Sequence, residues 1–291
     1  MNIKVKAALL SILSNTFLIL TKITAGLLSN SISVLSEALH SGMDLIASFI
    51  AFFSVSLSSK PPDKEHPYGH GKIENISGTI EGILLIIAAG LIILSAGKKI
   101  FNPQPLQQTN IAILVMFLSA VINIFVSRYL YKVAKKEDSI ALEADALHLK
   151  TDIYTSIGVG IGIILIKYTG LVIIDPIIAI LVALLIIKEA IMLCSRAFLP
   201  LLDSRLPEQE EALIKEILDQ YQGPISGYHK LKTRKSGKER YVEFHLEVNP
   251  DLSIKDYQEI LEKIQEDLKN NFDDITVTIQ AESAEPPKPS G

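Results

Sequence analysis

The sequence predicts an all-α membrane domain followed by a small α+β domain. Long apolar stretches fill the first two thirds of the chain and contain few charges, although 21% of all residues are charged and 48% are hydrophobic. Lysine and glutamate become frequent in the last third, where shorter apolar patterns of helical and strand period alternate. Such a shift in composition is typical of a membrane domain joined to a water-soluble one.

Six apolar stretches are long enough to cross a bilayer, which takes about 20 residues of helix. We expect them to form a six-helix transmembrane bundle within a domain of residues 1–200. Polar or turn-forming residues separate the stretches, among them Asn102-Pro103 and Thr169-Gly170. The predicted helices cover residues 7–28, 32–57, 76–100, 109–132, 140–166 and 171–195.

Basic residues set the expected orientation of this bundle. They are concentrated near the first and last residues of the membrane domain and around the loops after the second and fourth helices, which all lie on one side. The opposite side carries Lys98, Lys99 and Lys167. Positively charged loops tend to stay in the cytoplasm. We therefore expect a multi-pass protein with both termini cytoplasmic, surrounded by the lipids of a bacterial or archaeal plasma membrane.

The last third predicts a cytoplasmic domain of residues 201–283 in the order α-β-β-α-β, with its sheet covered on one face. The expected elements are a helix that opens at Pro207, strands 228–233 and 240–248, a helix 253–269 and a strand 275–280. Residues 284–291 are rich in proline, and we expect them to be a disordered tail.

One polar phrase occurs twice in the membrane domain. His40 and Asp44 belong to the second predicted helix, and His148 and Asp152 belong to the fifth. Residues i and i+4 share one face of a helix, so each helix presents an imidazole beside a carboxylate. Two such helices facing each other supply a tetrahedral ligand set for a divalent transition metal, with Zn²⁺ the first choice.

A structural alternative for this phrase is that each helix buries a His–Asp hydrogen bond. Ionisable groups are costly at membrane depth, at ~2.5–3.5 kcal/mol for Asp on insertion scales, so two copies favour an ion pathway. Neutral imidazole and carboxylate bind metal, and both take up protons when the metal leaves. The same residues, with His40 and His148 foremost, are therefore expected to couple metal to protons.

Asp63, His66 and His70 form a second candidate metal site in the loop after the second helix. Their spacing of three and four residues suits one metal bound by a turn. One alternative is a charged cytoplasmic loop with Gly69 and Gly71 as turn residues. The loop is also long enough to form an entry path that attracts the ion.

The duplicated phrase and the loop motif from Asp63 to Lys72 resemble those of the cation diffusion facilitator family. The likeness covers residues 5–285, almost the whole chain. It implies a homodimer of metal/proton antiporters, each with six helices and a cytoplasmic ferredoxin-like domain. The set of two histidines and two aspartates is similar to that of the zinc-selective members. The resemblance also implies zinc at the loop site.

The resemblance places His229 and His245, on the two cytoplasmic strands, at positions that bind regulatory zinc, and Glu282 joins them as a candidate ligand. Gln258 and Gln280 stand where the family often has histidine. We therefore expect one weak site rather than a two-metal cluster. Two ordinary strand histidines are the alternative.

Lys72 and Asp203 match a charge pair that, in the family, ties the third helix to the end of the sixth. We expect this structural pair to act near a hinge at the cytoplasmic surface.

Net charge and cysteine content argue against a nucleic-acid partner and against cysteine-based sites. The net charge of −4 does not suit a nucleic-acid partner. Cys194 is the single cysteine, which excludes an intrachain disulfide and a multi-cysteine metal site.

The predicted function is proton-coupled efflux of Zn²⁺ from the cytoplasm by alternating access, not an enzymatic reaction. Export of mainly Fe²⁺, Cd²⁺, Co²⁺ or Mn²⁺ by the same fold is one alternative. A membrane-anchored metal sensor and an intramembrane metalloprotease are the others, although the sequence contains no HExxH motif of the kind that a metalloprotease would use.

Overall fold

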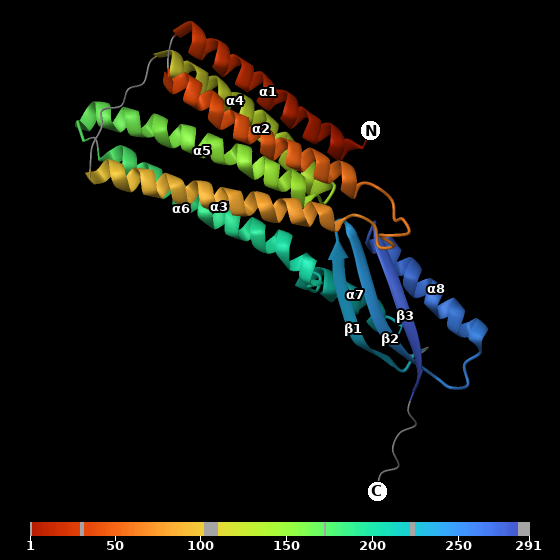
Figure 1. Ribbon diagram of the computed structural model, residues 1–291. Coiled ribbons are helices and arrows are strands. Elements are labelled where there is room, and N and C mark those ends of the chain that lie inside the picture. Colours follow the sequence, from red (N-terminus) through yellow and green to blue (C-terminus); the bar gives the residue numbers. More distant parts are fainter. Residues whose placement is uncertain (1, 30–31, 102–109, 172, 222–224, 285–291) are drawn as a thin grey trace. The chain divides into compact units, whose positions relative to one another are not determined.

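The computed structural model describes residues 2–29, 32–101, 110–171, 173–221 and 225–284. It divides into two compact units, Met1–Phe198 and Leu199–Gly291. Figure 1 labels the elements of each unit. The predicted disorder of the tail concerns residues 285–291, which lie outside the described residues.

The first unit is a bundle of six helices, as predicted. They are α1 (Ile3–Ser29), α2 (Ile32–Ser58), α3 (Lys72–Phe101), α4 (Asn110–Lys136), α5 (Ile140–Thr169) and α6 (Ile174–Phe198). Side by side lie α1 with α2, α3 with α6, and α4 with α5 (Figure 1). The bundle is the membrane domain of the predicted fold class.

Four of the six helices, α1, α3, α4 and α6, contain described stretches that are long and apolar enough to span a membrane. Charged and polar side chains gather in the first half of α5, where they are Glu143, Asp145, His148, Lys150 and Asp152. The two helices that carry the duplicated phrase therefore depend on their neighbours to cover polar groups.

Small residues let the helices approach one another. Ala7, Ala8, Ala134 and Ala141 are fully or almost fully buried in the cluster where α1, α4 and α5 meet. Between α3 and α5, a Cβ atom built on Gly78 would lie 3.3 Å from Cγ1 of Ile140. Close approach through small residues is the usual way in which membrane helices pack.

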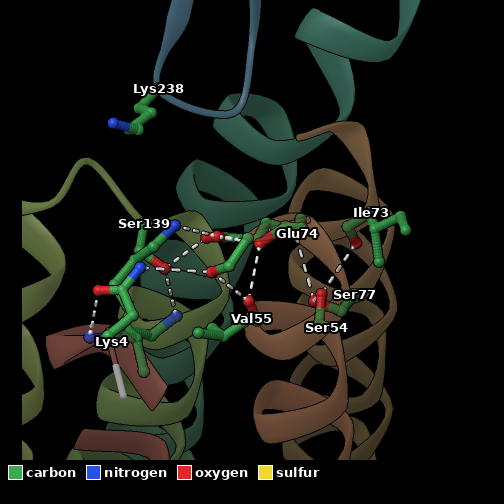
Figure 2. Close-up of polar contacts among 12 residues, drawn as sticks. Lys4, Ser54, Val55, Ile73, Glu74, Ser77, Ser139 and Lys238 are labelled. Atoms are coloured by element: carbon green, nitrogen blue, oxygen red, sulfur yellow. Dashed lines mark hydrogen bonds and ion pairs between the residues drawn. The ribbon is translucent and has the colours of Figure 1, made fainter. Parts of the chain in front are cut away.

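A buried carboxylate joins four helices at the end of the bundle where α3 and α5 begin (Figure 2). Glu74 of α3 accepts hydrogen bonds from Lys4 Nζ of α1 and Ser58 Oγ of α2, each at 2.6 Å. It also accepts one from the hydroxyl of Ser139, which caps α5 by accepting from the backbone N–H of Leu142. Every group here is satisfied by a partner from another helix, so this network fixes the helix ends to one another.

The second unit has the predicted α-β-β-α-β order, preceded by a short 3₁₀ helix. Its elements are η1 (Leu199–Leu202), α7 (Glu208–Asp219), β1 (Gly227–Ser236), β2 (Glu239–Val248), α8 (Ile254–Asn271) and β3 (Ile275–Ser283). The sheet order is β1-β2-β3, with β1 and β2 antiparallel and β2 and β3 parallel. The strands extend beyond the predicted ranges, and the pairing of β1 with β2 is interrupted by a register shift between His229 and Lys232.

The alternation of side chains along β2 divides this sheet into a covered and an open face. Val242, Phe244 and Leu246 are buried in the core that the sheet forms with α7 and α8. His245 and Glu247 alternate with them and remain partly accessible on the other face. The pattern that makes the core therefore also places the strand histidine outside it.

Candidate functional site

The duplicated phrase brings three side chains together between α2 and α5. Asp44, His148 and Asp152 each offer one ligand atom, and these atoms lie within 4.8 Å of one another. His148 Nε2 lies 2.9 Å from Asp44 Oδ1, a contact that joins the two helices. Asp44 is only 4% exposed. This arrangement can hold one small cation with a nitrogen and two oxygen donors.

His40 is the remaining member of the predicted set. It belongs to α2, one helical turn before Asp44. Its side chain is outside the described part of the structure, so its role as the fourth ligand stays a prediction.

Polar groups around this site reach back to α1 and α4. Asn123 Nδ2 of α4 lies 3.4 Å from Asp152 Oδ2. Ser48 Oγ of α2 donates to Asp145 Oδ1 at 3.1 Å and accepts from Asn15 Nδ2 of α1 at 2.7 Å. These contacts orient the carboxylates that border the site, as second neighbours of metal ligands commonly do.

Sequence reasoning missed two of the polar groups near this site, Asn123 and Glu81. Both are buried within helices that are otherwise apolar enough to span a membrane. A lone acid or amide inside such a stretch is itself the signal that would have identified them.

The loop residues Asp63, His66 and His70 also lie together, with ligand atoms within 4.8 Å of one another. Asp63 Oδ1 lies 3.2 Å from His66 Nδ1, and Asp63 Oδ2 lies 3.4 Å from His70 Nε2. Gly69 adopts a positive φ of 76°, which lets the chain turn between the two histidines. Asp63 and His66 are about half exposed, whereas the side chain of His70 is 10% exposed.

Backbone hydrogen bonds stabilise the charged form of Asp63. Its Oδ1 accepts the backbone N–H of His66 at 2.7 Å and that of Glu65 at 3.0 Å. The hydrogen bond from the His66 backbone is the main cause that lowers the pKa of Asp63 below its ordinary value. The carboxylate is therefore charged and available for a cation throughout the physiological pH range.

The cytoplasmic candidates meet on the open face of the sheet. His229 and His245 are directly opposite each other across β1 and β2, and their rings lie 5.4 Å apart. Glu282 of β3 lies 2.9 Å from His229 Nε2 and is hydrogen-bonded to His245 Nδ1. That bond to His245 is the main cause that lowers the pKa of Glu282. Gln280 is the β3 partner of His245 in the parallel register.

The predicted charge pair falls in two separate units. Lys72 is the first residue of α3, and Asp203 follows η1 with a positive φ of 53°. Within its own unit, Asp203 lies 3.3 Å from Arg234 Nη1. The pairing of Lys72 with Asp203 stays a prediction.

Comparisons with known proteins match both units. Residues 8–202 match the cation efflux transmembrane domain, and residues 206–284 match the cytoplasmic domain of cation efflux proteins. An uncharacterized transporter of Methanocaldococcus jannaschii is 35% identical, and the match covers 88% of this chain and 89% of the relative. An uncharacterized transporter of Synechocystis is 32% identical over 92% of this chain and 86% of the relative. The cation-efflux pump FieF of Shewanella oneidensis is 30% identical over 90% and 88%.

These matches define the class of protein as a multi-pass membrane protein that moves cations out of a compartment. The chain belongs to the cation efflux family, the cation diffusion facilitators that the sequence motifs indicated. Membership confirms the transporter prediction at the level of metal-cation efflux and disfavours the metalloprotease alternative.

Proposed function

We propose that this protein exports Zn²⁺ from the cytoplasm in exchange for protons. The observation that carries the proposal is the convergence of Asp44, His148 and Asp152, from two helices, on a volume that one ion can fill. His40 completes the tetrahedral set. The ion is the substrate, held during transport and then released.

The donor types support zinc as the preferred ion. Imidazole nitrogen suits Zn²⁺ better than Mn²⁺, whereas carboxylate oxygen accepts both. A set of two imidazoles and two carboxylates therefore favours zinc among the divalent ions that the family exports. Fe²⁺, Cd²⁺ and Co²⁺ also accept such ligands, and the transport assay below compares them.

Competition for the same atoms supports the coupling to protons. A protonated imidazole cannot bind metal, so the His148 ring and the adjacent carboxylates exchange protons for the ion. Alternating access of the site to the two sides of the membrane then converts a proton gradient into metal efflux.

The cytoplasmic unit supports a homodimer that responds to metal. Its match to the cytoplasmic domain of cation efflux proteins is consistent with dimerisation. His229, His245 and Glu282 offer a surface site for a regulatory zinc ion, and the loop residues offer another. With both termini in the cytoplasm, these sites sample the metal that the protein exports.

Flux into proteoliposomes tests the proposal. Purified protein is reconstituted with a pH dye inside, and Zn²⁺, Fe²⁺, Mn²⁺, Cd²⁺ and Co²⁺ are added in turn. We expect zinc to produce the fastest proton flux, in the direction opposite to that of the metal. Asp152→Asn should abolish this flux, while Glu189→Gln, which alters an acid paired with Lys150 elsewhere in the bundle, should retain it.

Two results would contradict the proposal. Metal binding without flux in wild-type vesicles would indicate a membrane-anchored sensor. Wild-type flux in a well-folded Asp152→Asn protein would place the transport site elsewhere.

A further inference from the structure

Glu81 is an unsatisfied acid inside the bundle. It lies in the span formed by α3 and is 1% exposed. Neither of its carboxylate oxygens has a hydrogen-bond partner among the residues that the structure describes. Burying a carboxylate without a partner is unfavourable, so this group needs a cation or a proton.

Asp145 of α5 is a second buried acid with a free oxygen. It is fully buried, and its Oδ1 accepts from Ser48 Oγ. Its Oδ2 has no hydrogen-bond partner within the described part of the chain. One oxygen of Asp145 is therefore fixed in direction, and the other is available to a ligand.

The two acids lie at the same depth in the bundle. Ser139 bonds to Glu74 where α5 and α3 begin, and Gly78, one turn farther along α3, packs against Ile140, the first residue of α5. From the Ser139–Glu74 contact, α5 rises by about 9 Å to Asp145 and α3 by about 10.5 Å to Glu81. The two carboxylates are close enough for their charges to interact.

The basic side chains that enter this part of the bundle are held elsewhere. Lys4 binds Glu74 at 2.6 Å, and Lys22 donates to Ser41 Oγ at 2.7 Å. Ser41 precedes Asp44 along α2, whereas Ser48, the partner of Asp145, follows it. The two lysines therefore lie toward opposite ends of the site, which leaves a cation or a proton to balance the two acids.

We propose that Glu81 and Asp145 bind a divalent cation at a second position in the bundle, one helical turn from His148 on the side where α3 and α5 begin. The ligands are the free oxygens of the two carboxylates, with the Ser48 hydroxyl beside them. An all-oxygen site is less selective than one with imidazole and accepts hard ions such as Mn²⁺. This proposal goes beyond the proposed function, since it concerns an ion that is held outside the transport site.

Binding of Mn²⁺ to the full-length protein in lipid nanodiscs tests this position, measured by electron paramagnetic resonance. The other candidate sites are first removed in one background variant. Its substitutions are His40→Ala, Asp44→Asn, His148→Ala, Asp152→Asn, Asp63→Asn, His66→Ala, His70→Ala, His229→Ala and His245→Ala.

We expect this background to retain one bound Mn²⁺ per chain. Glu81→Gln and Asp145→Asn should each weaken that binding at least tenfold. Glu143→Gln is the matched control on α5, because the carboxylate of Glu143 is held by Lys135 at 3.3 Å and Arg196 at 2.8 Å. It should leave the binding unchanged.

Absence of bound Mn²⁺ in the background, or unchanged affinity in a monodisperse Glu81→Gln protein, would overturn the proposal. Should Glu81→Gln aggregate, Asp145→Asn decides the same question. A changed pH profile of zinc flux without any Mn²⁺ binding would also overturn it and assign the two acids to protons. Because the transport site is absent from the background, the result is independent of the flux assay with Asp152→Asn.

Discussion

Removal of the Glu74 carboxylate is expected to be among the most destabilising single changes in the membrane unit. Glu74 is 2% exposed, and the Lys4 side chain that it binds at 2.6 Å is 7% exposed. Glu74→Ala leaves this ammonium buried and unpaired. Breaking a buried ion pair from one side costs about 3–5 kcal/mol, and we expect a loss of unfolding free energy in that range.

The second half of this experiment separates the ion pair from its surroundings. Replacing both partners, as Lys4→Met with Glu74→Leu, removes the stranded charge and should recover most of the loss. Two hydroxyls, those of Ser58 and Ser139, still lose their acceptor. A deficit of about 1–2 kcal/mol should therefore remain, near the net value of two hydrogen bonds.

Helical circular dichroism during titration of the detergent-solubilised protein with SDS gives the unfolding free energies. Lys135→Met is the matched control, because Lys135 and Glu143 form an ion pair at 3.3 Å in which the lysine is about half exposed. Such a pair contributes roughly 0–1 kcal/mol. Were Glu74→Ala to cost no more than this control, the network in Figure 2 would be solvated and the reasoning refuted.

Three further changes have defined outcomes. A Cβ at Gly82 would overlap Sγ of Cys194, so Gly82→Ala should cost about 1–3 kcal/mol in the SDS titration and Cys194→Ala should restore stability. Burial and a hydrogen bond to Asp267 raise the pKa of Tyr221 to about 12. Because a raised pKa favours the neutral phenol, its stabilisation is complete below pH 10 and is lost as pH rises through 12. Tyr221→Phe should therefore reduce the loss of circular dichroism signal over that interval. His40→Asp should retain zinc flux and increase Mn²⁺ flux in the vesicle assay, and unchanged exclusion of Mn²⁺ would show that geometry sets the selectivity.

The positions of the helices could be predicted because burial in a membrane leaves a strong local pattern. A run of apolar residues needs no knowledge of its neighbours to be read as a helix. The start of α5 is also determined by local sequence, since the side chain of Ser139 caps the helix. The cytoplasmic strands followed from the alternation that buries Phe244 and leaves His245 on the open face.

The surroundings of the candidate site could not be predicted in the same way. Asp145 meets Ser48 across 97 positions of the chain, and nothing local to either residue specifies the other. The acid at Glu81 was visible in the sequence, but its relation to Asp145 depends on the depth at which α3 packs against α5. The pairing of Gln280 with His245 depends on the parallel register of β2 and β3. Each of these contacts is determined by tertiary packing and not by the hydrophobic periodicity of the sequence.

The polarity of α2 and α5 connects stability to the proposed transport. Both helices carry buried polar side chains that are hydrogen-bonded to α1 and α4, as between Ser48 and Asn15 or Asp152 and Asn123. A metal ion at Asp44 and Asp152 would draw the Asp152 carboxylate toward itself and away from Asn123. Metal binding and helix packing therefore compete for this carboxylate, so a change in occupancy alters which helix positions are favoured. Alternating access requires such a link between the ion and the packing of the helices that hold it.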